Sequence, residues 1–299
     1  AAEARSTQFH WTADPPLRLS GGPRGVDFDR LIATDGDARL VMEGRWAGPG
    51  GGYDWTGRAE RLDMGRLGFP REWDLAGRAD AELRVTGVAG DPRWEFRGRC
   101  LQPGTRGHAA DSLRVVAGGG PGRLELSEVR GMLDGGTLSV SGEVTGTARA
   151  WPDTLTGPGV LRWIADALRW NGMLRLDRLP LDRLEHMVPA ARAWKGRVSG
   201  ALEVGGRPGE PTLSWNAEAV PLAWGDYRLD GAAAHGRYRD GRLEVPEFRM
   251  TRGGVVSTVS GSMAVGLALG RRPDVPEAPM DWRVELPNGD LALIPMFVP

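Results

Sequence analysis

Apolar and polar residues alternate along most of this chain. In the segment 78–85 (RADAELRV) every second residue is apolar and the others are charged, and 198–204 (VSGALEV) repeats the pattern. Successive side chains of a strand point to opposite faces, so this period of two predicts strands with one apolar face. The alternation recurs at Trp94 and Phe96; Leu124 and Leu126; Leu138 and Val140; Leu213, Trp215, Ala217 and Ala219; Leu243 and Val245; Val255, Val259, Met263 and Val265.

Turn residues separate the alternating segments. Gly90-Asp91-Pro92, Asp134-Gly135, Asp240-Gly241 and Gly253-Gly254 lie between pairs of predicted strands. Such short turns join neighbouring antiparallel strands into hairpins. The sequence therefore predicts an all-β, antiparallel fold.

The chain also repeats itself. The segment 75–96 aligns without gaps on 194–215, so that Gly77, Leu83 and Pro92 meet residues 119 positions later. The same offset aligns GRLE at 122–125 with GRLE at 241–244, and VSG at 140–142 with VSG at 259–261. Repeats of this length are typical of arrays in which each unit packs on the next. The predicted organisation is the end of a first repeat with a linker over 1–68, a second repeat with a linker over 69–180, a third over 181–280, and the start of a fourth over 281–299.

Helical periodicity is confined to the junctions between repeats. Leu181, Leu184 and Met187 are spaced as on one face of a short helix before Pro189, and Met64 holds the equivalent place one repeat earlier. The linker 151–168 also predicts one or two turns of amphipathic helix.

The balance of charges argues against nucleic acid and anionic membrane surfaces as partners. With 38 basic and 39 acidic residues the net charge is −1, so no overall field favours nucleic acid or an anionic membrane surface. The single Cys100 excludes an intrachain disulfide, and no apolar run is long enough for a membrane-spanning helix. Because the chain begins at Ala1 without a signal-like stretch, we expect a processed or excised piece whose membrane anchor lies elsewhere.

Catalytic and metal-binding signatures are missing from the sequence. The four histidines have no metal-ligand spacing, and the glycine-rich segments 21–25 and 118–122 lack the Lys-Ser/Thr of a phosphate loop. Asp91 and Glu210 occupy equivalent turn positions, which favours a structural role. Trp94 and Trp215 share one strand position, which favours packing over sugar stacking. We expect no enzyme activity, no metal and no cofactor.

The order of features resembles a known family. A short helix ending in Pro70 or Pro189 is followed by Gly77 or Gly196, an alternating strand, a G-x-x-x-[DE]-P turn at 87–92 or 206–211, and a GG…VSG strand pair. This order resembles the AsmA-like superfamily and, within it, the TamB family, the translocation and assembly module of bacterial envelopes. The segment 281–299 (DWRVELPNGDLALIPMFVP) is similar to the opening of that family's repeat.

The resemblance implies a fold and a function. The fold is an elongated, twisted, taco-like (U-shaped) antiparallel β-sheet built from repeats of about 100–120 residues with short helices between them. The family's apolar groove lies in the periplasm of diderm bacteria, anchored to the inner membrane, and carries phospholipid acyl chains between the two membranes. An Omp85-type outer-membrane barrel is the partner that the family implies.

An acyl-chain groove needs a continuous apolar surface without hydrogen-bonding demands. We expect small residues such as Ala81, Gly200 and Ala217 to leave room in it. Three alternatives remain open: a closed β-sandwich with these residues as its core, an assembly module that offers sheet edges to outer-membrane strands, and a secreted adhesin or glycan-active enzyme. The candidate groove residues are Leu83, Val85, Trp94, Phe96, Leu124, Leu202, Val204, Leu213, Trp215, Leu243 and Val259.

Overall fold

The structure is a computed structural model, and it describes most of the strands that the sequence predicts. The described residues are 5–6, 9–13, 19–22, 25–47, 51–66, 76–88, 91–105, 108–146, 168–184, 194–207, 209–224, 227–267, 274, 276 and 278–287. The predicted amphipathic helix of 151–168 lies almost wholly outside them, as does most of the segment 286–299. By contacts the chain divides into two units, Ala1–Asp134 with Ser139–Thr145, and Gly135–Leu138 with Gly146–Pro299.

Unit 1 is made of antiparallel strands. Its long strands pair in chain order from β4 to β9, then β9 pairs with β11 and β11 with β12. The strands are β1 (Arg5–Ser6), β2 (Phe9–His10), β3 (Thr12–Ala13), β4 (Leu19–Gly22), β5 (Gly25–Asp35), β6 (Ala38–Ala47), β7 (Gly52–Asp63), β8 (Ala76–Val88), β9 (Asp91–Thr105), β10 (His108–Ala109), β11 (Ser112–Gly120) and β12 (Arg123–Leu133). The next strand, β13 (Gly136–Gly146), is divided between the two units.

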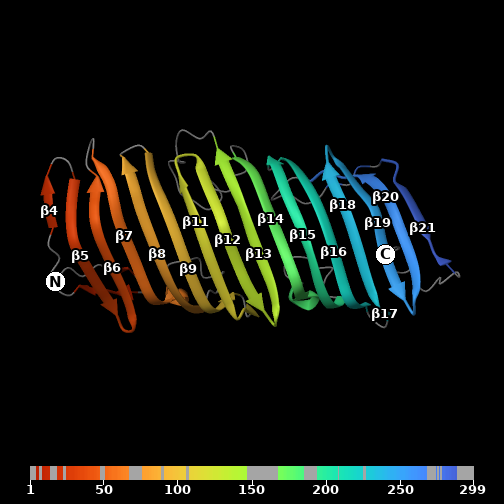
Figure 1. The fold of residues 1–299 in the computed structure, drawn as a ribbon, viewed down its shortest axis with the longest axis horizontal. Helices are drawn as coiled ribbons and strands as arrows, with labels where there is room; N and C mark the ends of the chain where they lie inside the picture. The colour runs from red at the N-terminus through yellow and green to blue at the C-terminus, as the bar shows by residue number, and fades with distance from the viewer. Residues whose placement is uncertain are drawn as a thin grey trace. The chain divides into compact units, whose positions relative to one another are not determined.

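Unit 2 repeats this arrangement. Each long strand pairs antiparallel with the next, except that β16 pairs with both β17 and β18 (Figure 1). The strands are β14 (Leu168–Pro180), β15 (Trp194–Arg207), β16 (Glu210–Trp224), β17 (Tyr227–Leu229), β18 (Gly231–Arg239), β19 (Arg242–Arg252), β20 (Val255–Ala264) and β21 (Asp281–Glu285). The predicted all-β, antiparallel fold is confirmed.

Where the structure describes the predicted short helices, it shows 3₁₀ turns. These turns are η1 (Met64–Arg66) and η3 (Leu181–Leu184), and the rest of the predicted helix, 185–188, lies outside the described residues. No helix in the described ranges is long and apolar enough to cross a lipid bilayer.

The repeat is visible in the backbone as well as in the sequence. The turn pair Asp134-Gly135 has φ values of 48° and 74°, and Gly253-Gly254, 119 positions later, has 56° and 79°. Positive φ at both central residues is the geometry that suits a tight hairpin between twisted strands. The same hairpin therefore recurs at the same place in the second and third repeats.

A strand bulge is repeated with its hydrogen bond. Arg61 and Arg178 both have positive φ, beside register shifts in β7 and β14. The N–H of Arg61 donates to Asp80 Oδ1 at 2.8 Å, and the N–H of Arg178 donates to Ser199 Oγ at 2.9 Å. Asp80 and Ser199 are 119 positions apart, so equivalent side chains satisfy the N–H that each bulge frees.

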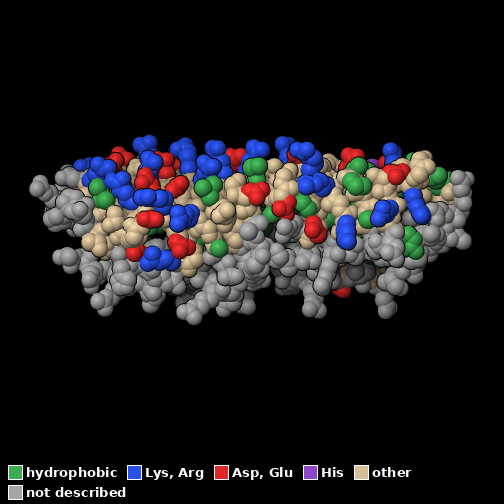
Figure 2. Space-filling view, turned by 90° about the horizontal axis from the view of Figure 1, so that it is seen from below, with side chains coloured by type: hydrophobic (Ala, Val, Ile, Leu, Met, Phe, Trp, Pro, Cys, Tyr) green, Lys and Arg blue, Asp and Glu red, His purple; other side chains and the backbone are tan. Residues whose placement is uncertain are grey.

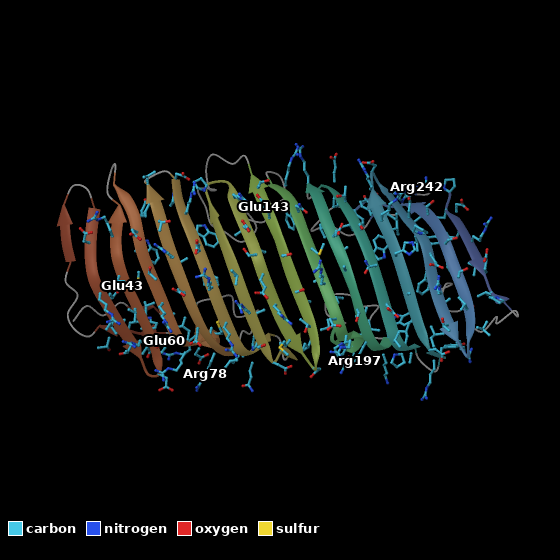
Figure 3. All side chains as sticks on the ribbon, in the orientation of Figure 1. Glu43, Glu60, Arg78, Glu143, Arg197 and Arg242 are labelled. Atoms are coloured by element: carbon cyan, nitrogen blue, oxygen red, sulfur yellow. The ribbon has the colours of Figure 1, made fainter. Side chains whose placement is uncertain are left out.

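The polar side chains that alternate with the apolar ones along each strand, here called the polar phase, form ion pairs of opposite charge. Arg45 bonds Asp27 at 2.6 Å across β6 and β5, and Arg237 contacts Glu244 at 2.6 Å across β18 and β19. Basic and acidic side chains are interspersed over the face seen in Figure 2. In Figure 3 the repeat-equivalent Arg78 and Arg197 each lie near the lower end of their own strand. Exposed pairs of this kind contribute little stability individually, but they keep the polar face soluble.

Candidate apolar binding face

In unit 1 the apolar phases of neighbouring strands meet in register. Val85 of β8 lies opposite Trp94 of β9, and Leu83 lies opposite Phe96. Side chains directly opposite on one face of a sheet are in contact distance. The strand pairing extends these contacts into two rows across the sheet, one through Trp55, Val85, Trp94, Gly119 and Leu124 and one through Met42, Gly57, Leu83, Phe96, Ala117 and Leu126.

Unit 2 has two corresponding rows. Leu202 of β15 lies between Leu174 of β14 and Trp215 of β16, and Leu213 lies opposite Val204. The structure thus brings the candidate residues of each unit together. One row runs through Leu174, Leu202, Trp215 and Gly236, where a bulge in β18 interrupts the pairing, and Val245 lies opposite Gly261 beyond it. The other row runs through Gly172, Val204, Leu213, Tyr238, Leu243 and Met263.

The aromatic rings in these rows lie over glycines. A methyl group added to Gly98 would lie 2.9 Å from the Phe96 ring, and one added to Gly119 would lie 3.1 Å from the Trp94 ring. One added to Gly236 would overlap the Trp215 ring. Each ring therefore covers backbone that has no side chain, which holds the ring down against the sheet.

The candidate residues are only partly buried. Leu83, Val85, Trp94, Phe96, Leu124, Leu202, Val204, Leu213, Trp215 and Leu243 all retain some solvent exposure. In a closed sandwich the alternating inward residues of both sheets fill a dry core. Among the described residues the most deeply buried large side chains, Leu179 and Met250 at 1% exposure, lie outside the rows, and Tyr238 is the one large row member that is buried. This burial pattern disfavours a closed sandwich in the two units.

Val259 differs from the other candidates. It is 6% exposed and belongs to a cluster of buried residues in unit 2, beside Phe248 on β19. Leu181 of η3, Trp194 and Leu286 pack against this cluster, so its surface is already covered. The buried members are Ala219, Leu222, Leu229, Ala232, Met250 and Val259.

The sequence interpretation missed several members of the rows. Met42 and Leu174 belong to strands whose alternation is interrupted by glycine or bulges. Tyr238 is a further member, 4% exposed, and its hydroxyl accepts a hydrogen bond from the N–H of Leu267 at 3.1 Å. The glycines beneath the rings were also missed. Gly57 and Gly98 follow an aromatic residue of their own strand by two positions, which is a signal in the sequence. Gly119 and Gly236 lie under rings of another strand and have no such signal.

Titratable chemistry is sparse on the apolar face. Cys100 lies at the edge of the rows in β9, and burial raises the pKa of its thiol. The thiolate is the nucleophilic and metal-binding form, so burial makes Cys100 unreactive at neutral pH. Within the described parts of the chain, no group of three or more His, Cys, Asp or Glu side chains gathers as a metal site would.

Two depressions have both charged and apolar residues in their linings, and the one in unit 2 includes Val204, Leu213 and Tyr238 of the apolar rows. One, of about 780 Å³ in unit 2, has both charges in its lining, including Glu203, Arg237 and Glu244. The other, of about 320 Å³ in unit 1, is lined by Arg58, Asp80, Glu82, Arg97, Arg99 and Arg114 among others.

No family model, no curated protein and no solved structure matches this chain significantly.

Proposed function

We propose that this chain is part of a non-enzymatic envelope protein in the periplasm of a diderm bacterium. Its apolar face carries phospholipid acyl chains between the inner and outer membranes. In this proposal the inner-membrane anchor and the contact with an Omp85-type outer-membrane barrel belong to segments outside the chain. The resemblance of the repeats to the TamB family supports the location and the partner.

One observation carries the proposal for lipid. Most large apolar side chains of the rows in both units remain partly exposed, and Tyr238 is the exception. Each methylene group removed from water would nevertheless stabilise the protein by about 0.8 kcal/mol. Exposed apolar rows of this extent mark a surface that is covered by a ligand or partner. Acyl chains fit such a surface because they make no hydrogen bonds, and most side chains of the rows are aliphatic or aromatic carbon.

The first test is native mass spectrometry, with solvent extraction, of the chain expressed in a bacterial periplasm. We expect co-purified phospholipid at a defined stoichiometry. Leu202→Asp puts a charge at the centre of the unit 2 rows and is expected to abolish lipid retention while the protein still folds. Ser214→Asp is the matched control, because Ser214 lies exposed on the neighbouring strand in the polar phase.

Two outcomes would contradict the proposal. If Leu202→Asp loses its β-sheet circular dichroism while Ser214→Asp keeps it, Leu202 belongs to a closed core. If the unaltered chain is folded and monodisperse but free of lipid, the apolar face does not hold acyl chains under these conditions.

A second candidate function is strand addition to outer-membrane β-proteins. The observation that favours it is β21, whose five residues are all exposed and which pairs only with β20 among the described strands. An exposed sheet edge offers free N–H and C=O groups to an added strand. Trp282 and Val284, at 39% and 47% exposure, would contact alternate side chains of that strand.

Val284→Pro tests this second candidate. Proline has no N–H and blocks edge pairing, so cross-linking of an unfolded outer-membrane protein to β21 should be lost. Lipid retention should be unchanged. Cross-linking that persists in Val284→Pro would exclude β21 as the docking edge.

A further inference from the structure

Three arginines form a row across the polar face of unit 1. Arg99 of β9 lies directly opposite Arg114 of β11, and Arg114 lies directly opposite Arg130 of β12. All three are exposed. Neighbouring strands are about 4.8 Å apart, so the row places three positive charges within roughly 10 Å. Like charges directly opposite on a sheet destabilise it.

The neighbouring carboxylates compensate this row only in part. Arg114 contacts Glu128 at 3.3 Å. Asp80, opposite Arg99, already accepts the N–H of Arg61. Among the described residues, neither Arg99 nor Arg130 forms an ion pair. Three positive charges therefore face two carboxylates, Asp80 beside Arg99 and Glu128 beside Arg114, and the row keeps a net positive charge.

The fold itself does not require these arginines. In the repeat 119 positions later, Glu218 stands at the place of Arg99 and Ala233 at that of Arg114, and only Arg249 matches Arg130. Those residues also lie opposite one another across β16, β18 and β19, so the two rows are structurally equivalent. One backbone thus accepts a mixed row in unit 2 and a purely basic row in unit 1.

Exposed apolar side chains border the basic row. Leu101 and Met132 both lie opposite Ser112, in the next row of the polar phase, with 49% and 44% exposure. Arginine beside exposed methionine and leucine is the composition of protein-binding surfaces. We propose that this patch, made of Arg99, Arg114, Arg130, Leu101 and Met132, docks an acidic, amphipathic segment of a partner protein.

The distribution of charge favours a narrow segment over a membrane surface. The adjoining row of the same face carries Glu82 and Glu128 together with Arg97. Glu95 lies one row further, opposite Arg84. A flat anionic bilayer would meet these carboxylates together with the arginines. An extended segment can follow the arginine row alone and place its apolar residues on Leu101 and Met132.

The test uses a fluorescein-labelled twelve-residue peptide with five glutamates and three leucines as the probe. Fluorescence anisotropy should show binding to the chain that weakens as salt is raised. The variant R99Q/R114Q/R130Q should lower the affinity at least about tenfold, a loss of the size seen for buried interface charges. The matched control R207Q/R228Q/R249Q removes the same number of exposed arginines from unit 2 and should bind the peptide as the unaltered chain does.

Three results would overturn the proposal. Equal loss in the control would show non-specific attraction. Binding of vesicles with 30% phosphatidylglycerol that depends on the same arginines, without peptide binding, would identify a membrane-contact surface instead. A lower midpoint of thermal unfolding in R99Q/R114Q/R130Q would show that the row serves the fold. The proposal expects the midpoint to hold or rise, because repulsion between like charges is removed.

Discussion

Unit 2 uses one sheet face in two ways. At one end of its strands, Leu222, Leu229 and Met250 are buried beneath η3 and neighbouring segments. Further along the same strands, Leu202, Leu213 and Trp215 have the same alternation but stay partly exposed. The buried end acts as a conventional core, and the exposed rows offer a surface. An identical sequence pattern therefore has two physical roles, and the covering segments decide which one applies.

Shortening a side chain should lower the free energy of unfolding much more in the buried cluster of unit 2 than in its exposed rows. Met250→Ala removes a side chain that is 1% exposed and should lower the free energy of unfolding by about 2–5 kcal/mol. Leu213→Ala in the exposed rows should cost about 1 kcal/mol or less, because less surface is buried there. Urea unfolding followed by circular dichroism measures both. Equal costs would mean that the rows are a closed core.

The next largest effect is expected from substituting a glycine that lies beneath an aromatic ring of the exposed rows. Gly236→Ala forces the Trp215 ring off the sheet and should cost about 1–3 kcal/mol, with a shift in tryptophan fluorescence. It should also reduce lipid retention, because the ring then stands in the path of the acyl chains. Gly209→Ala, where an added methyl group meets nothing, is the control. Unchanged fluorescence in Gly236→Ala would argue against the flat ring.

Cys100 reports on the apolar face without mutation. Because burial raises the pKa of its thiol, the thiolate form is scarce below that pKa and becomes more populated as the pH rises through it. Alkylation at pH 7 should therefore be slow, roughly tenfold or more below a free thiol, and should accelerate in denaturant. Fast alkylation of the folded protein would show that the edge of the unit 1 rows opens readily.

The smallest effect on stability and on lipid retention is expected from a substitution in the polar phase. Arg84 lies exposed opposite Glu95 and Thr56. Arg84→Glu should change the free energy of unfolding by less than about 0.5 kcal/mol and leave lipid retention intact. A large loss of either property would mean that the polar face contributes to the proposed function.

Much of the fold could be predicted because strand formation is a local property. The alternation at 78–85 and 198–204 and the turns Asp134-Gly135, Asp240-Gly241 and Gly253-Gly254 appear in the structure as expected, and equivalent turns are 119 residues apart. The candidate site was predicted less completely. Leu202 and Val259 have the same pattern in sequence, yet only Val259 is covered. The direction of the Trp215 ring depends on Gly236 of another strand, which no local pattern reveals.

The sequence by itself determined the period of two in each strand, which residues of a strand share a face, and the repeated order of strands and turns. Each of these properties depends on residues close together in the chain. The tertiary structure decided which apolar residues are covered, which rings lie over glycines, and that Arg99, Arg114 and Arg130 share one row. These properties depend on register between strands and on the segments that pack against them. Register is set by the turns and bulges of the folded sheet, so a shift of one residue would move every side chain to the opposite face.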